Sequence, residues 1–88
     1  MSEELRAHKV KRLYMRSIRR GIKEMDLILT SFADRHLAQM DDAALDLYDA
    51  MLNENDHDLY QWVTGQQPAL AQYTDLIEEI TADFSPLK

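Results

Sequence analysis

Residues 20–26 read Arg20-Gly21-Ile22-Lys23-Glu24-Met25-Asp26, and they join a basic helical segment to an acidic remainder. Glycine inside a helix costs about 1 kcal/mol relative to alanine, so Gly21 fits better in a turn that needs a positive φ or a close backbone approach. The residues predict a bend, for which two interpretations stay open. In one, the bend displays Arg20 and Glu24, as a recognition site would. The alternative is structural: a glycine that ends a helix, with an Arg20–Glu24 pair worth a few tenths of a kcal/mol.

Charge is unevenly distributed along the chain, which carries −6 overall. Residues 1–23 hold eight Lys or Arg side chains and two Glu, a net +6, whereas residues 24–88 hold two basic and fourteen acidic side chains, a net −12. Such asymmetry indicates a surface that selects a charged partner, or two halves of one fold that attract each other. The isoelectric point of about 4.8 argues against nucleic acid as the partner, because phosphate binding is largely a charge effect.

Length and composition predict one small helical domain over residues 1–88, with a short C-terminal tail from about residue 85. The absence of cysteine excludes disulfides, a thiol nucleophile and a Cys-type zinc site. No apolar run approaches the roughly 18 residues that a membrane span needs, and the first five residues lack the pattern of a secretory signal. We expect a cytoplasmic protein that makes no membrane contact and is a monomer when free.

Apolar residues recur at helical spacing throughout the chain, and no segment alternates as a strand would. The expected helices cover residues 5–19, 22–40, 41–52, 58–64 and 68–84. Asn55 or Asp56 is the predicted cap of the fourth helix, and Pro68 the first residue of the fifth. Short connections between five helices predict an all-α, compact five-helix bundle. Its single core is expected to contain Leu13, Phe32, Tyr48, Trp62 and Ile77.

No stretch has the pattern of a catalytic or metal site. Gly21 and Gly65 are the only glycines, so there is no phosphate-binding loop, and the three histidines are scattered. The run from Asn53 resembles the start of a calcium loop, but Asp58 stands where glycine is required and Thr64 where glutamate is required. We predict no catalytic residue, no bound metal and no FAD bound by the protein itself, since a bundle this small has little room for a cofactor pocket.

Several short motifs follow one another in a fixed order. Arg20-Gly21-x-x-Glu24-Met25-Asp26 comes after Lys11-Arg12-Leu13-Tyr14-Met15-Arg16-Ser17 and before Phe32-Ala33-Asp34, Leu45-Asp46-Leu47-Tyr48 and Asp56-His57-Asp58-Leu59-Tyr60-Gln61-Trp62. Over about residues 8–70 this set resembles the succinate dehydrogenase assembly factor family, the small flavinator proteins. The likeness is closest to its alphaproteobacterial and mitochondrial branch, and the absence of a transit peptide favours the bacterial side.

The resemblance implies a five-helix fold and a protein that is not itself an enzyme. It implies binding to the flavoprotein subunit of succinate dehydrogenase, and in some members of the related fumarate reductase. That binding promotes covalent attachment of FAD, the partner's cofactor, to a histidine of the subunit. Family function centres on the Arg-Gly-x-x-Glu motif. The residues that we expect at the partner-binding site are Arg16, Arg19, Arg20, Gly21, Glu24 and Asp26.

Two other functions stay open on the residues alone. The first is a regulatory, antitoxin-like binding module that uses the basic first helix; steep salt dependence of nucleic-acid binding would support it. The second is a structural helical adaptor, in which Gly21 is only a turn.

Overall fold

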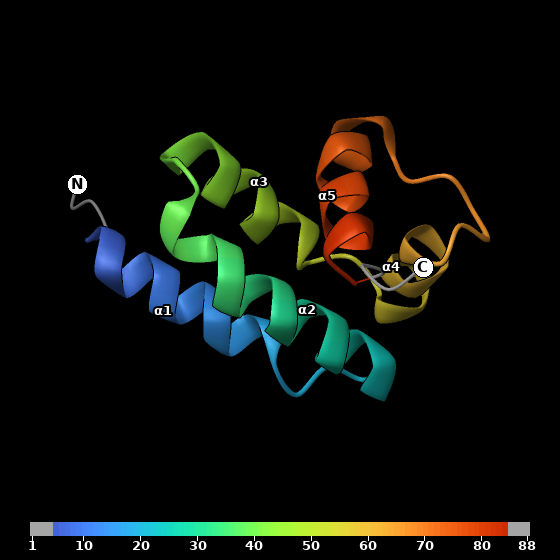
Figure 1. Ribbon diagram of the computed structural model, residues 1–88, viewed down its shortest axis with the longest axis horizontal. Coiled ribbons are helices and arrows are strands. Elements are labelled where there is room, and N and C mark those ends of the chain that lie inside the picture. The colour runs from blue at the N-terminus through green and yellow to red at the C-terminus, as the bar shows by residue number, and fades with distance from the viewer. Residues whose placement is uncertain (1–4, 85–88) are drawn as a thin grey trace.

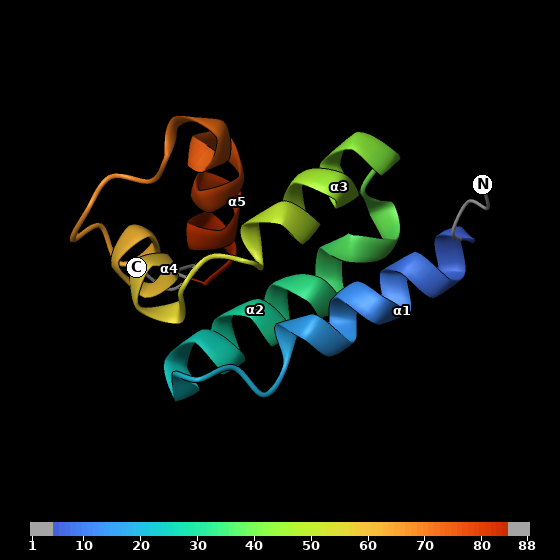
Figure 2. The same cartoon turned by 180° about the vertical axis from the view of Figure 1, so that it is seen from behind.

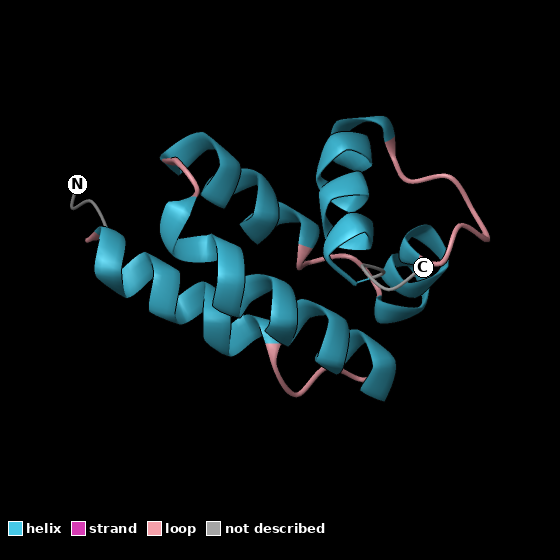
Figure 3. Cartoon of the chain, viewed as in Figure 1, coloured by secondary structure: helices cyan, strands magenta, loops and turns pink. Residues whose placement is uncertain are grey.

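The computed structural model describes residues 5–84, and within them the chain is all-α (Figures 1 and 3). This confirms the predicted five-helix bundle. The predicted tail from about residue 85 lies outside the described residues. The elements are α1 (Arg6–Ser17), α2 (Lys23–His36), the 3₁₀ turn η1 (Leu37–Gln39), α3 (Asp42–Met51), α4 (Asp56–Val63), the 3₁₀ turn η2 (Ala71–Tyr73) and α5 (Thr74–Phe84).

The long helix α2 is the centre of the bundle, because it packs against α1, α4 and α5. It runs antiparallel to α1, and α3 then returns in the direction of α1, as both views show (Figures 1 and 2). The N-terminal end of α2 lies beside α4. The bend between α1 and α2 is thereby brought close to the start of α4, although 35 residues separate them in the sequence.

One continuous apolar core holds the helices together, and α2 contributes the largest share of it. Phe32 stacks on Tyr48 with ring centroids 5.7 Å apart, so the middle of α2 is joined to α3. Of the predicted core residues, Leu13, Phe32, Tyr48 and Ile77 are buried, as expected. Trp62 is not: it is half-buried and packs on the edge of the core, 6.1 Å from Tyr73.

The placement of Trp62 follows from the geometry of α4. Leu59 and Val63 are the residues of this short helix that face the core. Trp62 lies about 100° around the helix from Val63 and about 60° from Leu59, on the side away from Val63, so it is at the margin of the buried face. The indole therefore lies at the surface between α4 and α5, and the prediction that it is a central core residue was wrong.

Two helix starts also differ from the sequence prediction. Asn55, not Asp56, caps α4, since its Oδ1 accepts a 2.7 Å hydrogen bond from the His57 amide, and the helix starts at Asp56, two residues before the predicted start. Pro68 does not open α5. Leu70 belongs to the helix predicted over residues 68–84, but it has an extended backbone and is 44% exposed. The helix begins only at Thr74.

Candidate partner-binding site

Basic side chains of α1 and the bend after it pair with acidic side chains of α3 and α4. We call this set the ion-pair ladder; its pairs are Arg6–Asp42, Lys9–Asp46, Arg12–Asp49, Arg16–Asp49 and Arg20–Asp56. Because α1 and α3 run in the same direction, both residue numbers rise together along the ladder. The basic and acidic parts of the chain thus attract each other within the fold, which was one of the two explanations considered for the uneven charge of the sequence.

The pairs of the ladder differ in burial and therefore in strength. Asp42 and Asp46 are 79% and 70% exposed, and exposed pairs contribute about 0–1 kcal/mol to stability. Partial burial by itself would raise the pKa of Asp49, but hydrogen bonds and positive charge from Arg12 and Arg16 outweigh it and lower the pKa below its usual value. The pair at the bend is the most enclosed, with Arg20 11% and Asp56 19% exposed.

Gly21 is required at the bend for close approach to another segment. Its amide donates a 2.6 Å hydrogen bond to Oδ2 of Asp56, and a Cβ atom at this position would lie 3.0 Å from the same oxygen. The positive φ of the bend belongs to Arg19, at 59°, and not to Gly21. Of the two reasons considered for a glycine in this turn, close backbone approach is the one that applies.

Arg20 is turned into the protein, so the prediction that the bend displays it was wrong. Its Nε donates to Oδ1 of Asp56 at 2.8 Å, and its Nη1 donates to the carbonyl oxygen of Arg16 at 2.8 Å. Its Nη2 donates to the carbonyl oxygen of Leu52 at 3.2 Å. The Arg20–Glu24 pair of the structural alternative does not form within the described chain, because the guanidinium pairs with Asp56 instead.

The remaining predicted residues fall into two groups. Arg16 belongs to the ladder and donates to Oδ1 of Asn53 at 2.7 Å, and the half-buried Asp26 accepts a hydrogen bond from Thr30 one turn along α2. Arg19 and Glu24 are exposed, and neither side chain forms an ion pair or hydrogen bond with another described residue. The side chains of Arg16 and Asp26 are thus engaged within the described chain, whereas those of Arg19 and Glu24 are exposed at the bend.

Sequence reasoning missed two residues of this region. Asp56 was considered as a helix cap and as part of a family motif but not as a residue of the bend, although its carboxylate holds both Arg20 and Gly21. Lys23, the first residue of α2, is exposed beside Glu24 and likewise has no side-chain partner in the described chain. A signal for Asp56 was present, because each cation of the ladder is followed 33–37 residues later by its acidic partner.

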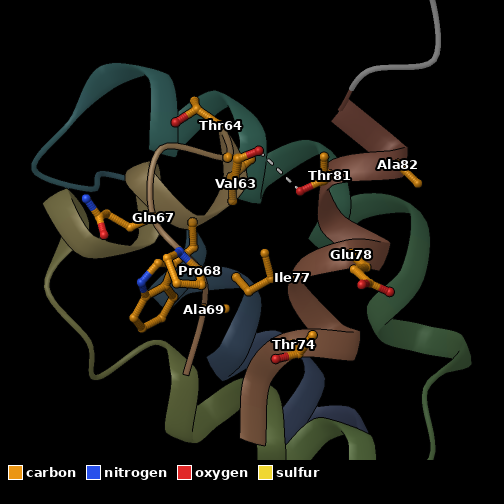
Figure 4. Close-up of a pocket in the computed structure, with 12 residues that line it drawn as sticks. Val63, Thr64, Gln67, Pro68, Ala69, Thr74, Ile77, Glu78, Thr81 and Ala82 are labelled. Carbon is orange, nitrogen blue, oxygen red and sulfur yellow. Dashed lines mark hydrogen bonds between the residues drawn. The ribbon is translucent and has the colours of Figure 1, made fainter. Parts of the chain in front are cut away.

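A groove with a volume of about 750 Å³ lies between α4 and α5. Its walls include Trp62, Pro68 and Ile77. A 3.3 Å hydrogen bond from Thr81 Oγ1 in α5 to the carbonyl oxygen of Val63 joins α5 to the end of α4 (Figure 4). This volume lies within the range of small-molecule sites, so lack of room was a poor reason for expecting no bound FAD. That expectation now depends on the missing phosphate-binding loop alone. None of the predicted site residues lines the groove.

Comparison with known proteins identifies the family. Residues 11–83 match the family described as flavinator of succinate dehydrogenase, a span that includes the bend and all of α4. The chain belongs to this family. The resemblance drawn from the ordered motifs is thereby confirmed.

Three similar proteins are each named succinate dehydrogenase assembly factor 2, mitochondrial. That of Candida glabrata is 55% identical over 53 residues, which cover 60% of this chain and 35% of the relative. That of Meyerozyma guilliermondii is 48% identical over 61 residues, covering 69% and 45%. That of Aedes aegypti is 38% identical over 84 residues, covering 93% and 52%. The chain thus spans from about a third to about half the length of these relatives.

The names of these relatives place them in mitochondria, whereas the sequence led us to expect a cytoplasmic protein; that expectation stays a prediction. None of the helices described in residues 5–84 is both long enough and apolar enough to cross a membrane.

Proposed function

We propose that this protein is an assembly factor that binds the flavoprotein subunit of succinate dehydrogenase and promotes the covalent attachment of FAD to it. The observation that carries the proposal is the family match over residues 11–83, within which the Arg-Gly-x-x-Glu motif lies at an exposed bend. Arg19, Lys23 and Glu24 surround that bend, and their charges are unpaired within the described chain. We take these side chains and the exposed Gly21 backbone as the surface that meets the flavoprotein.

The protein acts by binding, without a catalytic group of its own. The bond between flavin and histidine is formed by the chemistry of FAD and its acceptor, so a helper protein needs only to supply orientation and electrostatics. Tighter binding to the flavoprotein conformer in which flavin and histidine meet would raise the population of that conformer. FAD is then held by the partner, and this chain holds neither FAD nor a metal.

The ladder argues against the antitoxin-like alternative that uses the basic first helix. Cations that bind nucleic acid must be free to replace the counterions of phosphate groups. Here Arg6, Lys9, Arg12 and Arg16 already pair with carboxylates of α3. What remains exposed at the bend is of mixed sign, which suits a protein surface better than a phosphate backbone.

Affinity purification tests the proposal directly. The chain, tagged at one end, is expressed with the flavoprotein subunits of succinate dehydrogenase and fumarate reductase, each in a separate culture. We expect the succinate dehydrogenase subunit to co-purify in a complex that survives nuclease treatment. Recovery of nucleic acid in place of the flavoprotein, with binding that weakens steeply as salt is raised, would support the antitoxin-like alternative instead. Recovery of neither would contradict the proposed function.

A further inference from the structure

Asp56 meets the bend with both of its carboxylate oxygens. Oδ1 accepts a hydrogen bond from Nε of Arg20 at 2.8 Å and lies 2.7 Å from Nη2 of the same guanidinium, and Oδ2 accepts from the amide of Gly21 at 2.6 Å. A single side chain at the start of α4 therefore fixes two consecutive residues of the loop between α1 and α2. Hydrogen bonds between charged groups are roughly twice as strong as neutral ones, so this contact is well suited to hold a loop in one conformation.

Arg20 joins three helix ends at once. In addition to Asp56, its guanidinium donates to the carbonyl oxygen of Arg16 in the last turn of α1 and to that of Leu52, the residue that ends α3. Carbonyl groups in the last turn of a helix lack intrahelical partners, so each of these bonds satisfies a group that would otherwise need water. Turning Arg20 outward toward a partner protein would break these bonds.

The same carboxylate favours glycine at position 21. A Cβ atom there would lie 3.0 Å from Oδ2 of Asp56, tighter than nine in ten contacts of real Cβ atoms, so the carboxylate would have to shift by a few tenths of an ångström. Moving it would lengthen its bonds to both Arg20 and the Gly21 amide. Gly21 and Asp56 therefore form a matched pair, and the first two residues of the Arg-Gly-x-x-Glu motif depend on a residue outside the motif.

We propose that Asp56 is a positioning residue that holds the bend in its docking conformation, and that Arg20 acts inside the protein as part of the same device. This inference rests on the proposed function. The flavoprotein is then contacted by the exposed Gly21 backbone and by Arg19, Lys23 and Glu24. Asp56 itself does not touch the partner; its effect on binding is transmitted through Arg20 and Gly21.

Asp56→Asn tests the proposal, because asparagine keeps the shape of the side chain but presents one acceptor oxygen in place of two. We expect affinity for the purified flavoprotein subunit to fall at least tenfold at a temperature at which circular dichroism shows the variant fully folded. The control is Ile80→Val, which removes a methyl group from the buried core face of α5, a helix that contributes no residue to the bend. It should lower the melting temperature and leave the affinity unchanged.

Nuclear magnetic resonance gives a second measurement that does not need the partner. The chain has two glycines, so the amide signals of Gly21 and Gly65 are easily told apart from the rest. In Asp56→Asn the Gly21 amide should shift and exchange with solvent faster, whereas the Gly65 amide should not move.

The possible outcomes separate this inference from the proposed function. A wild-type protein that binds the flavoprotein, with Asp56→Asn binding equally well, would overturn the positioning role alone. The same follows if Asp56→Asn and Ile80→Val lose affinity in proportion to their loss of melting temperature, or if the Gly21 amide does not respond. A wild-type protein with no affinity for the flavoprotein would overturn the proposed function, and the docking role of Asp56 with it.

Discussion

Oγ of Ser17 and the phenolic oxygen of Tyr48 lie 2.6 Å apart in the core, between α1 and α3. Ser17 donates its own hydrogen to the Leu13 carbonyl at 2.8 Å, so Tyr48 is the donor in the contact between the two side chains. Both residues are fully buried, and in the described core this contact gives the two hydroxyl groups their partners. A polar pair in an otherwise apolar core fixes how α3 is rotated against α1.

The first prediction concerns alkaline pH. Burial raises the pKa of Tyr48 to about 12, and the hydrogen bond between Tyr48 and Ser17 and the positive charges of Arg20 and Arg16 reduce this rise only in part. An unfolded tyrosine ionises near pH 10, so the stability that Tyr48 supplies as a neutral phenol is complete below pH 10 and lost as pH rises toward 12. Ultraviolet absorbance should show one tyrosine ionising late, together with unfolding. Tyr48→Phe should remove this late phase; simultaneous ionisation of all tyrosines with the fold intact would contradict the assignment.

The second prediction concerns Arg20 as a structural residue. Arg20→Ala leaves the carboxylate of Asp56 without its main partner in a largely enclosed site, so we expect a loss of about 2 kcal/mol or more in the free energy of unfolding. Arg6→Ala is the matched control, because it removes the opposite end of the same ladder, where Asp42 is exposed. Its loss should stay below about 1 kcal/mol. Equal losses in urea titrations of the two variants would mean that Arg20 is not held as the structure has it.

The third prediction separates the two large aromatic residues. Phe32→Ala should cost about 3–5 kcal/mol, because Phe32 is buried between His36 and Tyr48. Trp62→Ala should cost clearly less, about 1–3 kcal/mol, because the indole is half-exposed beside Tyr73 and loses less contact. Chemical unfolding of both variants measures the difference. A Trp62→Ala protein as unstable as Phe32→Ala would restore the sequence-based view of Trp62 as a central core residue.

The fourth prediction concerns Arg19. Its φ of 59° is unfavourable for most residues but is tolerated by asparagine, so Arg19→Asn should leave the melting temperature unchanged or slightly raised. The same change removes an exposed cation from the proposed docking surface, and affinity for the flavoprotein should fall. The melting temperature should stay or rise while the affinity falls, so calorimetric melting and a binding titration on one sample separate the two effects. Unchanged affinity would exclude the Arg19 side chain from the interface.

The sequence was sufficient for the helices and for most of the core, because both depend on local periodicity. Leu13, Phe32, Tyr48 and Ile77 fall on stripes that the tertiary structure buries, whereas Leu70 falls on such a stripe and stays exposed. A stripe tells which residues share a helix face, but not where the neighbouring elements stop covering that face. For this reason the loop before α5 was wrongly predicted as helix.

The site was predicted less well, because its decisive contacts are long-range. Whether Arg20 points outward or toward Asp56 depends on the register of α1 against α3 and α4, which local spacing does not contain. The sequence identified Gly21 correctly as a residue of a bend, and close approach was among the reasons considered. The neighbour that requires the glycine could be found only after the chain had folded.

The most direct test of the account is a reconstitution of covalent flavinylation. Purified flavoprotein subunit without flavin is incubated with FAD, with and without this protein, and covalent flavin is followed over time as fluorescence of the subunit in a denaturing gel. The account predicts that the protein increases the rate of covalent attachment, and that Asp56→Asn loses most of the increase while Ile80→Val keeps it. The same time course with and without the wild-type protein would contradict the central claim.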